Sequence, residues 1–88
     1  MLIVRLFLVD STTPGEREAV ALKRVQAATG RFPETVRLQV IGLDDDEALD
    51  LGVAIAPTIM VGDTVISVGE PPLAGQIKRY IELELGAS

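Results

Sequence analysis

Residues 53–69, Val-Ala-Ile-Ala-Pro-Thr-Ile-Met-Val-Gly-Asp-Thr-Val-Ile-Ser-Val-Gly, decide the fold of this chain. Because proline has no amide hydrogen to donate to a strand ladder, Pro57 is expected at the first position of a strand or at the edge of a sheet. Apolar residues stand on both sides of Gly62-Asp63, a dipeptide whose leading glycine suits a two-residue type II′ turn. The stretch therefore predicts a β-hairpin that opens at Pro57 and ends before Gly69.

The segments before this hairpin predict a βαβ unit. Residues 2–9 are almost continuously apolar, which is typical of a strand covered on both faces in the middle of a parallel sheet. A helix is expected from about residue 14 to residue 29, and Gly30 is a suitable residue to end it. Residues 36–40 alternate between apolar and polar side chains, so we expect a half-buried strand at the edge of the sheet.

The C-terminal half adds a short helix over residues 44–51 and the two hairpin strands over residues 57–61 and 64–68. A final helix is expected after Pro71-Pro72, since proline cannot sit in a helix interior. Apolar residues spaced four apart are expected to form its buried stripe: Leu73, Ile77 and Ile81.

The composition of the 88 residues is that of one domain, and it excludes several function classes. The chain has no cysteine and no histidine, which removes thiol chemistry, structural zinc of the usual type and the commonest general base. A net charge of −5 and an aromatic content of 3% argue against nucleic acid as a partner. No apolar run approaches the ~20 residues of a membrane span, so we expect a soluble cytoplasmic protein with no membrane contact, cofactor or metal.

The order of elements resembles the minimal thioredoxin/glutaredoxin-like fold. In that family a Gly-Val pair precedes the proline and a glycine follows the hairpin, and Gly52, Val53, Pro57 and Gly69 match these positions. The resemblance covers essentially the whole chain. It implies a single thioredoxin-like α/β domain over residues 1–88, in the order β-α-β-α-β-β-α. The four-stranded mixed sheet would then have its strands in the spatial order second, first, third, fourth.

The chain departs from that family where the first strand meets the first helix. The family carries its Cys-x-x-Cys pair there, and this chain has Thr13-Pro14-Gly15-Glu16, so the disulfide exchange that defines the family is lost. The four residues themselves predict a capping box. In it Thr13 would be the N-cap residue, and the Glu16 side chain would reach back to the amide of Thr13.

The resemblance implies a binding groove formed by Thr13, Pro14, Ala56, Pro57 and Gly69. By this resemblance the Ala56–Pro57 peptide bond would be cis. In relatives of this fold, the backbone before the proline pairs with an extended peptide. The other interpretation is that Pro57 only shapes the start of the strand, and the residues alone leave both open. We therefore expect a non-catalytic protein-binding or assembly module whose partner is a protein segment.

Two other functions compete with this one. Thr13-Pro14 and Ala56-Pro57-Thr58 are also similar to motifs of the KaiB clock proteins, which implies a regulatory interaction domain. A vestigial glutathione- or anion-binding protein would need free amides at the helix start and a basic side chain nearby. The sequence suggests no basic residue close to that loop.

Two features outside the groove have simple structural interpretations. The acidic residues Asp44 to Glu47 invite a metal hypothesis, but Asp44 as N-cap with acids in the first helical turn explains them, and an EF-hand spacing is absent. Arg37 and Gln39 are expected on a solvated face of the edge strand. That edge could instead pair with a second copy, so a homodimer is possible.

Overall fold

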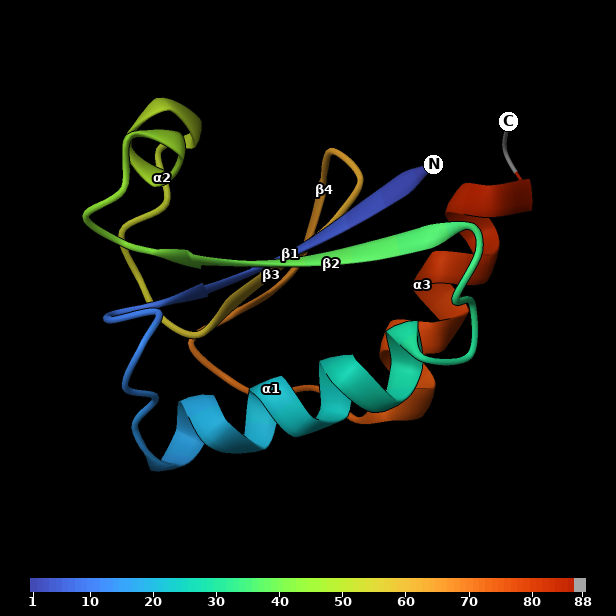
Figure 1. Cartoon of the computed structure of the whole chain (residues 1–88), viewed down its shortest axis with the longest axis horizontal. Coiled ribbons are helices and arrows are strands. Elements are labelled where there is room, and N and C mark those ends of the chain that lie inside the picture. The colour runs from blue at the N-terminus through green and yellow to red at the C-terminus, as the bar shows by residue number, and fades with distance from the viewer. Residues whose placement is uncertain (87–88) are drawn as a thin grey trace.

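The sheet and its helices follow the predicted order of elements (Figure 1). The computed structural model describes residues 1–86, and these residues contain four strands and three helices. The strands are β1 (Leu2–Leu8), β2 (Val36–Gly42), β3 (Thr58–Val61) and β4 (Thr64–Val68), and the helices are α1 (Glu16–Thr29), α2 (Asp46–Leu51) and α3 (Ala74–Gly86).

The four strands form one mixed sheet in the spatial order β2-β1-β3-β4. β1 pairs in parallel with β2 and antiparallel with β3, and β4 pairs antiparallel with β3. The predicted α/β class, the strand order, the central place of the first strand and the edge position of the second are confirmed.

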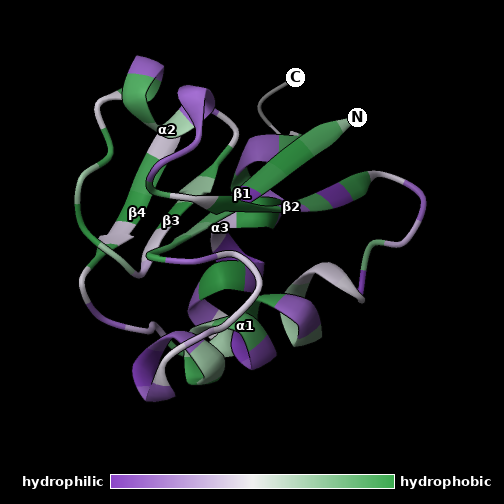
Figure 2. Cartoon of the chain, turned by 60° about the vertical axis from the view of Figure 1, so that its left-hand side comes forward, coloured by the Kyte–Doolittle hydropathy of each residue, from purple (hydrophilic) through white to green (hydrophobic). Residues whose placement is uncertain are grey.

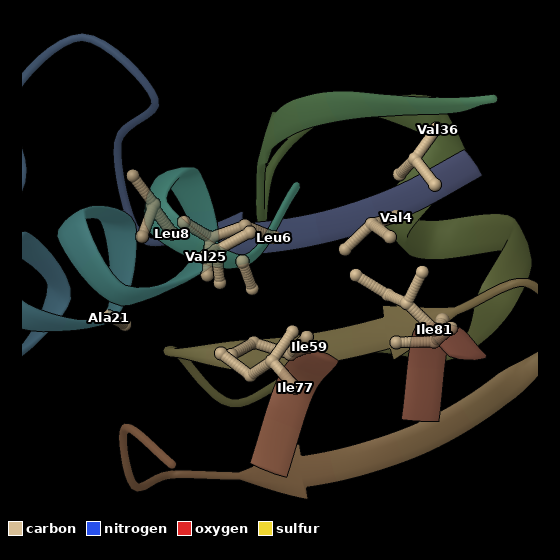
Figure 3. Close-up of a cluster of buried hydrophobic side chains, with 11 residues drawn as sticks. Val4, Leu6, Leu8, Ala21, Val25, Val36, Ile59, Ile77 and Ile81 are labelled. Atoms are coloured by element: carbon tan, nitrogen blue, oxygen red, sulfur yellow. The ribbon is translucent and has the colours of Figure 1, made fainter. Parts of the chain in front are cut away.

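The two faces of the sheet are covered unequally. α1 and α3 pack side by side on one face, and the short α2 covers one end of the other face (Figure 1). The main core lies between the sheet and the two long helices, where Leu6 of β1, Val25 of α1 and Ile77 of α3 have no solvent exposure (Figure 3). Among the described residues, no helix is long and apolar enough to cross a membrane.

A second, smaller core lies under α2. Phe7 of β1, Ile41 of β2, Met60 of β3 and Ala48 of α2 form this cluster. Because neighbouring strand residues point to opposite faces, Leu6 and Leu8 enter the main core while Phe7 enters the second. The two cores explain why the strand is apolar on both faces from Leu6 to Leu8, whereas Val9, the last apolar residue of the run, is 64% exposed.

The hairpin has the predicted two-residue loop, but β3 begins at Thr58, one residue after the start predicted at Pro57. Val61 pairs with Thr64, so two residues form the loop between β3 and β4. Gly62 has φ of +59°, and no residue other than glycine has a positive φ in the part of the chain described. Positive φ at the first loop residue alone is the pattern of a type II′ turn.

The starts of the last two helices differ from the predictions. The short helix has Asp45, not Asp44, as its N-cap, and the Asp45 carboxylate accepts from the amide of Gly42 at 3.0 Å. Leu73 precedes α3 and is 60% exposed, so the prediction that it belongs to the buried stripe is wrong. Its carbonyl accepts from the amides of Gln76 and Ile77, which makes it the N-cap residue, and its side chain points away from the core.

Gly52, which ends α2, offers a test of backbone conformation separate from packing. Its φ is +73°, and a Cβ built there would meet no atom within 4 Å. Gly52→Ala is therefore expected to cost about 1–2 kcal/mol of unfolding free energy through the left-handed conformation alone. Gly75→Ala is the matched control, since that site in α3 is also open and has no positive φ.

The control is expected to stabilise the protein by about 0.5–1 kcal/mol. Chemical denaturation of both variants measures the two effects. Equal changes in the two variants would contradict the assigned conformations.

Candidate functional site

The candidate site begins where the chain leaves α2 and enters β3. The Ala56–Pro57 peptide bond is cis, the conformation expected from the family resemblance, and Pro57 is fully buried. Ala56 is half-buried, and within residues 1–86 no hydrogen bond engages its amide or its carbonyl. The Thr58 hydroxyl donates to the Ile55 carbonyl at 2.5 Å, which holds the backbone on both sides of Ala56. The loop therefore presents the free amide and the free carbonyl of Ala56 from a fixed backbone.

Gly69, at the end of β4, lies against this loop. Its amide donates to the Pro57 carbonyl at 2.7 Å, and its φ is +82°. A Cβ built on Gly69 would lie 3.7 Å from Cγ2 of Ile55. The structure thus brings together Pro57 and Gly69, which are far apart in the sequence, and adds Ile55 to them.

Two exposed apolar side chains flank the loop. Ile55 is 54% exposed and Val68 is 53% exposed. In the β3–β4 ladder, Val68 lies opposite Thr58, the residue that follows Pro57. Figure 2 shows hydrophobic residues along this part of the sheet, where β3 and β4 lie side by side. We call Ile55, Ala56, Pro57, Val68 and Gly69 the Pro57 surface.

A basic side chain from α1 reaches the same place. Arg17 donates from Nη1 to the Gly69 carbonyl at 3.1 Å. About two helical turns further along α1, Arg24 donates to the Pro71 carbonyl at 2.9 Å. The two arginines hold the chain between β4 and α3 against α1. The expectation that no basic residue lies close to the loop at the start of α1 is therefore wrong, since Arg17 is in the first turn of that helix.

Thr13 and Pro14 lie in the loop that leads to α1. The Thr13 amide donates to the Asp10 carbonyl at 3.2 Å, and its hydroxyl is 3.5 Å from that of Thr12. In the described part of the chain, neither Thr13 nor Pro14 forms a hydrogen bond with Ala56, Pro57 or Gly69. The link from α1 to the Pro57 surface comes from Arg17 instead.

The capping box predicted for Thr13 and Glu16 is wrong. The N-cap residue is Gly15, and the Glu18 side chain accepts from its amide at 2.9 Å. The other carboxylate oxygen of Glu18 accepts from the Val9 amide at 2.6 Å. Gly15 and Glu18 have the same spacing as Thr13 and Glu16, and Glu18 alone also ties the helix to the end of β1.

Removing the Glu18 carboxylate should therefore destabilise the protein. Glu18→Ala is expected to lower the free energy of unfolding by about 1–2 kcal/mol, because two backbone amides lose a charged acceptor. Glu16→Ala and Thr13→Ala should each change it by less than about 0.5 kcal/mol. Denaturant titrations of the three variants give the comparison, and a larger loss for Thr13→Ala than for Glu18→Ala would refute this cap.

Asp10 predicts an effect of pH at the same loop. The Thr12 hydroxyl donates to the Asp10 carboxylate at 2.6 Å, and the Thr12 amide donates to it at 2.9 Å. These two bonds hold the pKa of Asp10 below its usual value of 3.8, and the bond from the hydroxyl has the larger effect. Because the pKa is lower in the folded state, the bonds to ionised Asp10 stabilise the folded protein fully above the pKa of the unfolded state. This stabilisation is lost as the pH falls through the pKa of the folded state.

An NMR titration of the Asp10 carboxyl carbon tests this. Thr12→Val should raise the pKa of Asp10 part of the way back, since the amide donor remains. A titration midpoint unchanged by Thr12→Val would show that the hydroxyl is not the cause.

The acidic residues before α2 have structural partners. Asp45 caps the helix, and a Glu47 oxygen lies 3.6 Å from Nε of Arg5. Nη1 of Arg5 donates to the Gly62 carbonyl at 3.2 Å, so Arg5 connects α2 with the hairpin turn. Over residues 1–86 no group of three or more acidic residues is placed to hold a metal ion.

Comparison with solved structures gives proteins of similar fold. A structure of thioredoxin-2, described as a component of malaria parasite protein secretion machinery, matches with a TM-score of 0.70 and 16% identity, over 94% of this chain and 82% of that chain. A Staphylococcus aureus protein of unknown function matches with a TM-score of 0.57 and 16% identity, over 99% of this chain and 94% of that one. No protein-family model and no curated protein matches.

At 16% identity these likenesses concern the fold alone. The similarity to KaiB proteins stays a prediction. The element order and the sheet order agree with the thioredoxin-2 match. This chain therefore has a thioredoxin-like fold, in a sequence that contains no cysteine.

Proposed function

We propose that this chain is a non-catalytic protein-binding module that holds an extended segment of a partner protein on the Pro57 surface. The observation that carries the proposal is that the amide and the carbonyl of Ala56 are both free beside the buried Pro57. A polar backbone group on a fixed loop is a ready partner for the main chain of an extended peptide. The absence of cysteine and histidine is the reason for a binding role instead of a redox or acid–base role.

The surroundings of Ala56 indicate what the segment would contain. Ile55 and Val68, on either side of the loop, are each more than half exposed. Covering one aliphatic side chain completely contributes about 1.5–3 kcal/mol. A partner segment with apolar side chains next to its paired peptide unit would therefore bind best, with backbone pairing giving the orientation and the apolar contacts giving the affinity.

A library of displayed linear peptides, selected against the wild-type protein, tests this proposal. Each selected peptide is then titrated against Ile55→Lys and against Leu83→Lys. Leu83 is a matched control because it is an exposed leucine on α3, at 62%, and the substitution adds the same charge. We expect Ile55→Lys to weaken binding at least about tenfold, as loss of one apolar contact implies, and Leu83→Lys to leave it unchanged.

Two results would overturn the proposal. One is a selection that yields no binding peptide. The other is a set of peptides that bind Ile55→Lys as tightly as the wild type, because their site would then lie elsewhere on the protein.

Arg17 favours one alternative, a small anion such as glutathione. Its guanidinium has five N–H donors, and the structure assigns one contact, to the Gly69 carbonyl. The Gly15 amide, however, is already bonded to the Glu18 carboxylate, which also places a negative charge at this end of α1. An NMR titration with reduced glutathione separates the two functions. Shifts at residues 13–18 that disappear in Arg17→Gln would favour the alternative.

A further inference from the structure

The outer edge of β2 is a second surface with unpaired backbone groups. In Figure 1 this strand crosses in front of β1 and β3. The Leu2 amide donates to the Thr35 carbonyl at 2.9 Å and the Leu43 amide donates to the Leu8 carbonyl at 2.8 Å, at the two ends of the β1–β2 ladder. In a parallel ladder alternate residues bond to the neighbouring strand. Residues 37, 39 and 41 therefore face β1, and residues 36, 38, 40 and 42 direct their amides and carbonyls outward.

Both ends of this edge are closed by the chain itself. The Val36 amide donates to the Phe32 carbonyl at 3.0 Å. The Gly42 amide donates to the Asp45 carboxylate at 3.0 Å, and the Gly42 carbonyl accepts from the Asp45 amide at 3.1 Å. Among residues 1–86 nothing bonds to the outward amides of Leu38 and Val40. The open part of the edge is thus short and centred on Gln39.

The opposite edge of the sheet carries a bulge, which hinders strand pairing. The β3–β4 register shifts between Ile59 and Met60, which marks a bulge. Bulges are one of the ways in which proteins block edge-to-edge association, and β2 has neither a bulge nor a proline.

We infer that β2 pairs antiparallel with β2 of a second copy of this chain, which extends the sheet across a two-fold axis. Aligning all seven residues of the strand puts the axis at Gln39 and places Leu38 opposite Val40 of the second copy. Each such pair exchanges two main-chain hydrogen bonds, so all the free amides of the two edges are used. Val40, a valine with 37% of its surface exposed, would be covered by Leu38 of the other copy.

The charges along the strand also fit a second copy. Arg31, Glu34 and Arg37 lie at its N-terminal end, and the four consecutive acids of residues 44–47 follow its C-terminal end. The antiparallel arrangement brings the end with two arginines to the acidic end of the other copy. Such local complementarity opposes the general repulsion between two chains of net charge −5.

Sedimentation velocity of the full chain over a range of concentrations, up to about 1 mM, measures the association. We expect a weak dimer that forms at the upper end of this range, because a ladder of one strand per copy buries less surface than a standard interface. Val40→Lys places a charge on the edge and should weaken the dimer at least about tenfold. Val20→Lys is the matched control, since Val20 is 40% exposed on α1, and it should leave the dimer unchanged.

A wild-type protein that stays monomeric at about 1 mM would overturn the inference, and so would a dimer that both lysine variants weaken equally. If Val40→Lys fails to fold, amide exchange of the wild type decides. Exchange at Leu38 and Val40 that slows as the concentration rises supports the paired edge, and exchange independent of concentration contradicts it.

Discussion

Replacing Ile77 with alanine is expected to lower the free energy of unfolding by about 2–5 kcal/mol, because it opens a cavity in the main core. Ile77 has no solvent exposure and lies between the sheet and α1. Leu73→Ala is the matched control. Leu73 precedes the same helix and is 60% exposed, so its truncation should change the free energy by less than about 0.5 kcal/mol.

Chemical denaturation of both variants measures the difference. The pair tests where α3 begins, since a helix extended to include Leu73 would bury that leucine one turn before Ile77. Comparable losses in the two variants would show that Leu73 packs in the core and that α3 begins before Ala74.

Phe7→Ala is expected to cost about 3–5 kcal/mol, a large share of the about 5–15 kcal/mol that stabilises an ordinary domain. Phe7 is the largest fully buried side chain and the centre of the second core, where it packs with Ile41, Ala48 and Met60. Tyr80→Ala provides a control for the loss of an aromatic ring, because Tyr80 is 43% exposed on α3.

The position of Phe7 also predicts which helix responds. α2 has six residues, too few to be stable by itself, and Ala48 is its buried residue. If Phe7→Ala still folds, the amides of α2 should exchange faster while those of α1 keep their protection. Equal loosening of α1 and α2 would contradict two separate cores.

The hairpin and the strand pattern could be predicted because local chemistry determines them. Pro57 has no amide hydrogen to donate, so it indicates the start of the hairpin. Gly62 reaches a positive φ at low cost, so it indicates the turn. The apolar run that begins at Leu2 predicted burial on both faces, and the two cores provide it for Leu6, Phe7 and Leu8. These predictions depend on single residues and their neighbours.

The helix starts could not be predicted because two capping solutions have the same spacing. Thr13 and Gly15 are both suitable N-cap residues with a glutamate three positions on, and the additional bond from the Val9 amide to Glu18 favours Gly15. Leu73 fits the apolar stripe by spacing, but the prolines before it leave it at the N-cap position. In both cases a tertiary or boundary contact decided between locally equivalent choices.

The candidate site was only partly visible in the sequence for a related reason. Pro57 and Gly69 could be paired because the hairpin between them sets their separation. Arg17 was missed because its contact with Gly69 spans 52 positions and has no local signal. Ile55 does have one, because it is an apolar residue in a loop, two positions before the proline that precedes a strand.

Hydrogen exchange at the Ala56 amide is the most direct test of the binding role. The measurement compares the free protein with the protein saturated by a peptide selected from the displayed library. If the bound segment pairs with the main chain at this loop, exchange of the Ala56 amide slows markedly on saturation. If a peptide is fully bound and that amide exchanges as fast as before, the loop before Pro57 is not where this protein holds its partner.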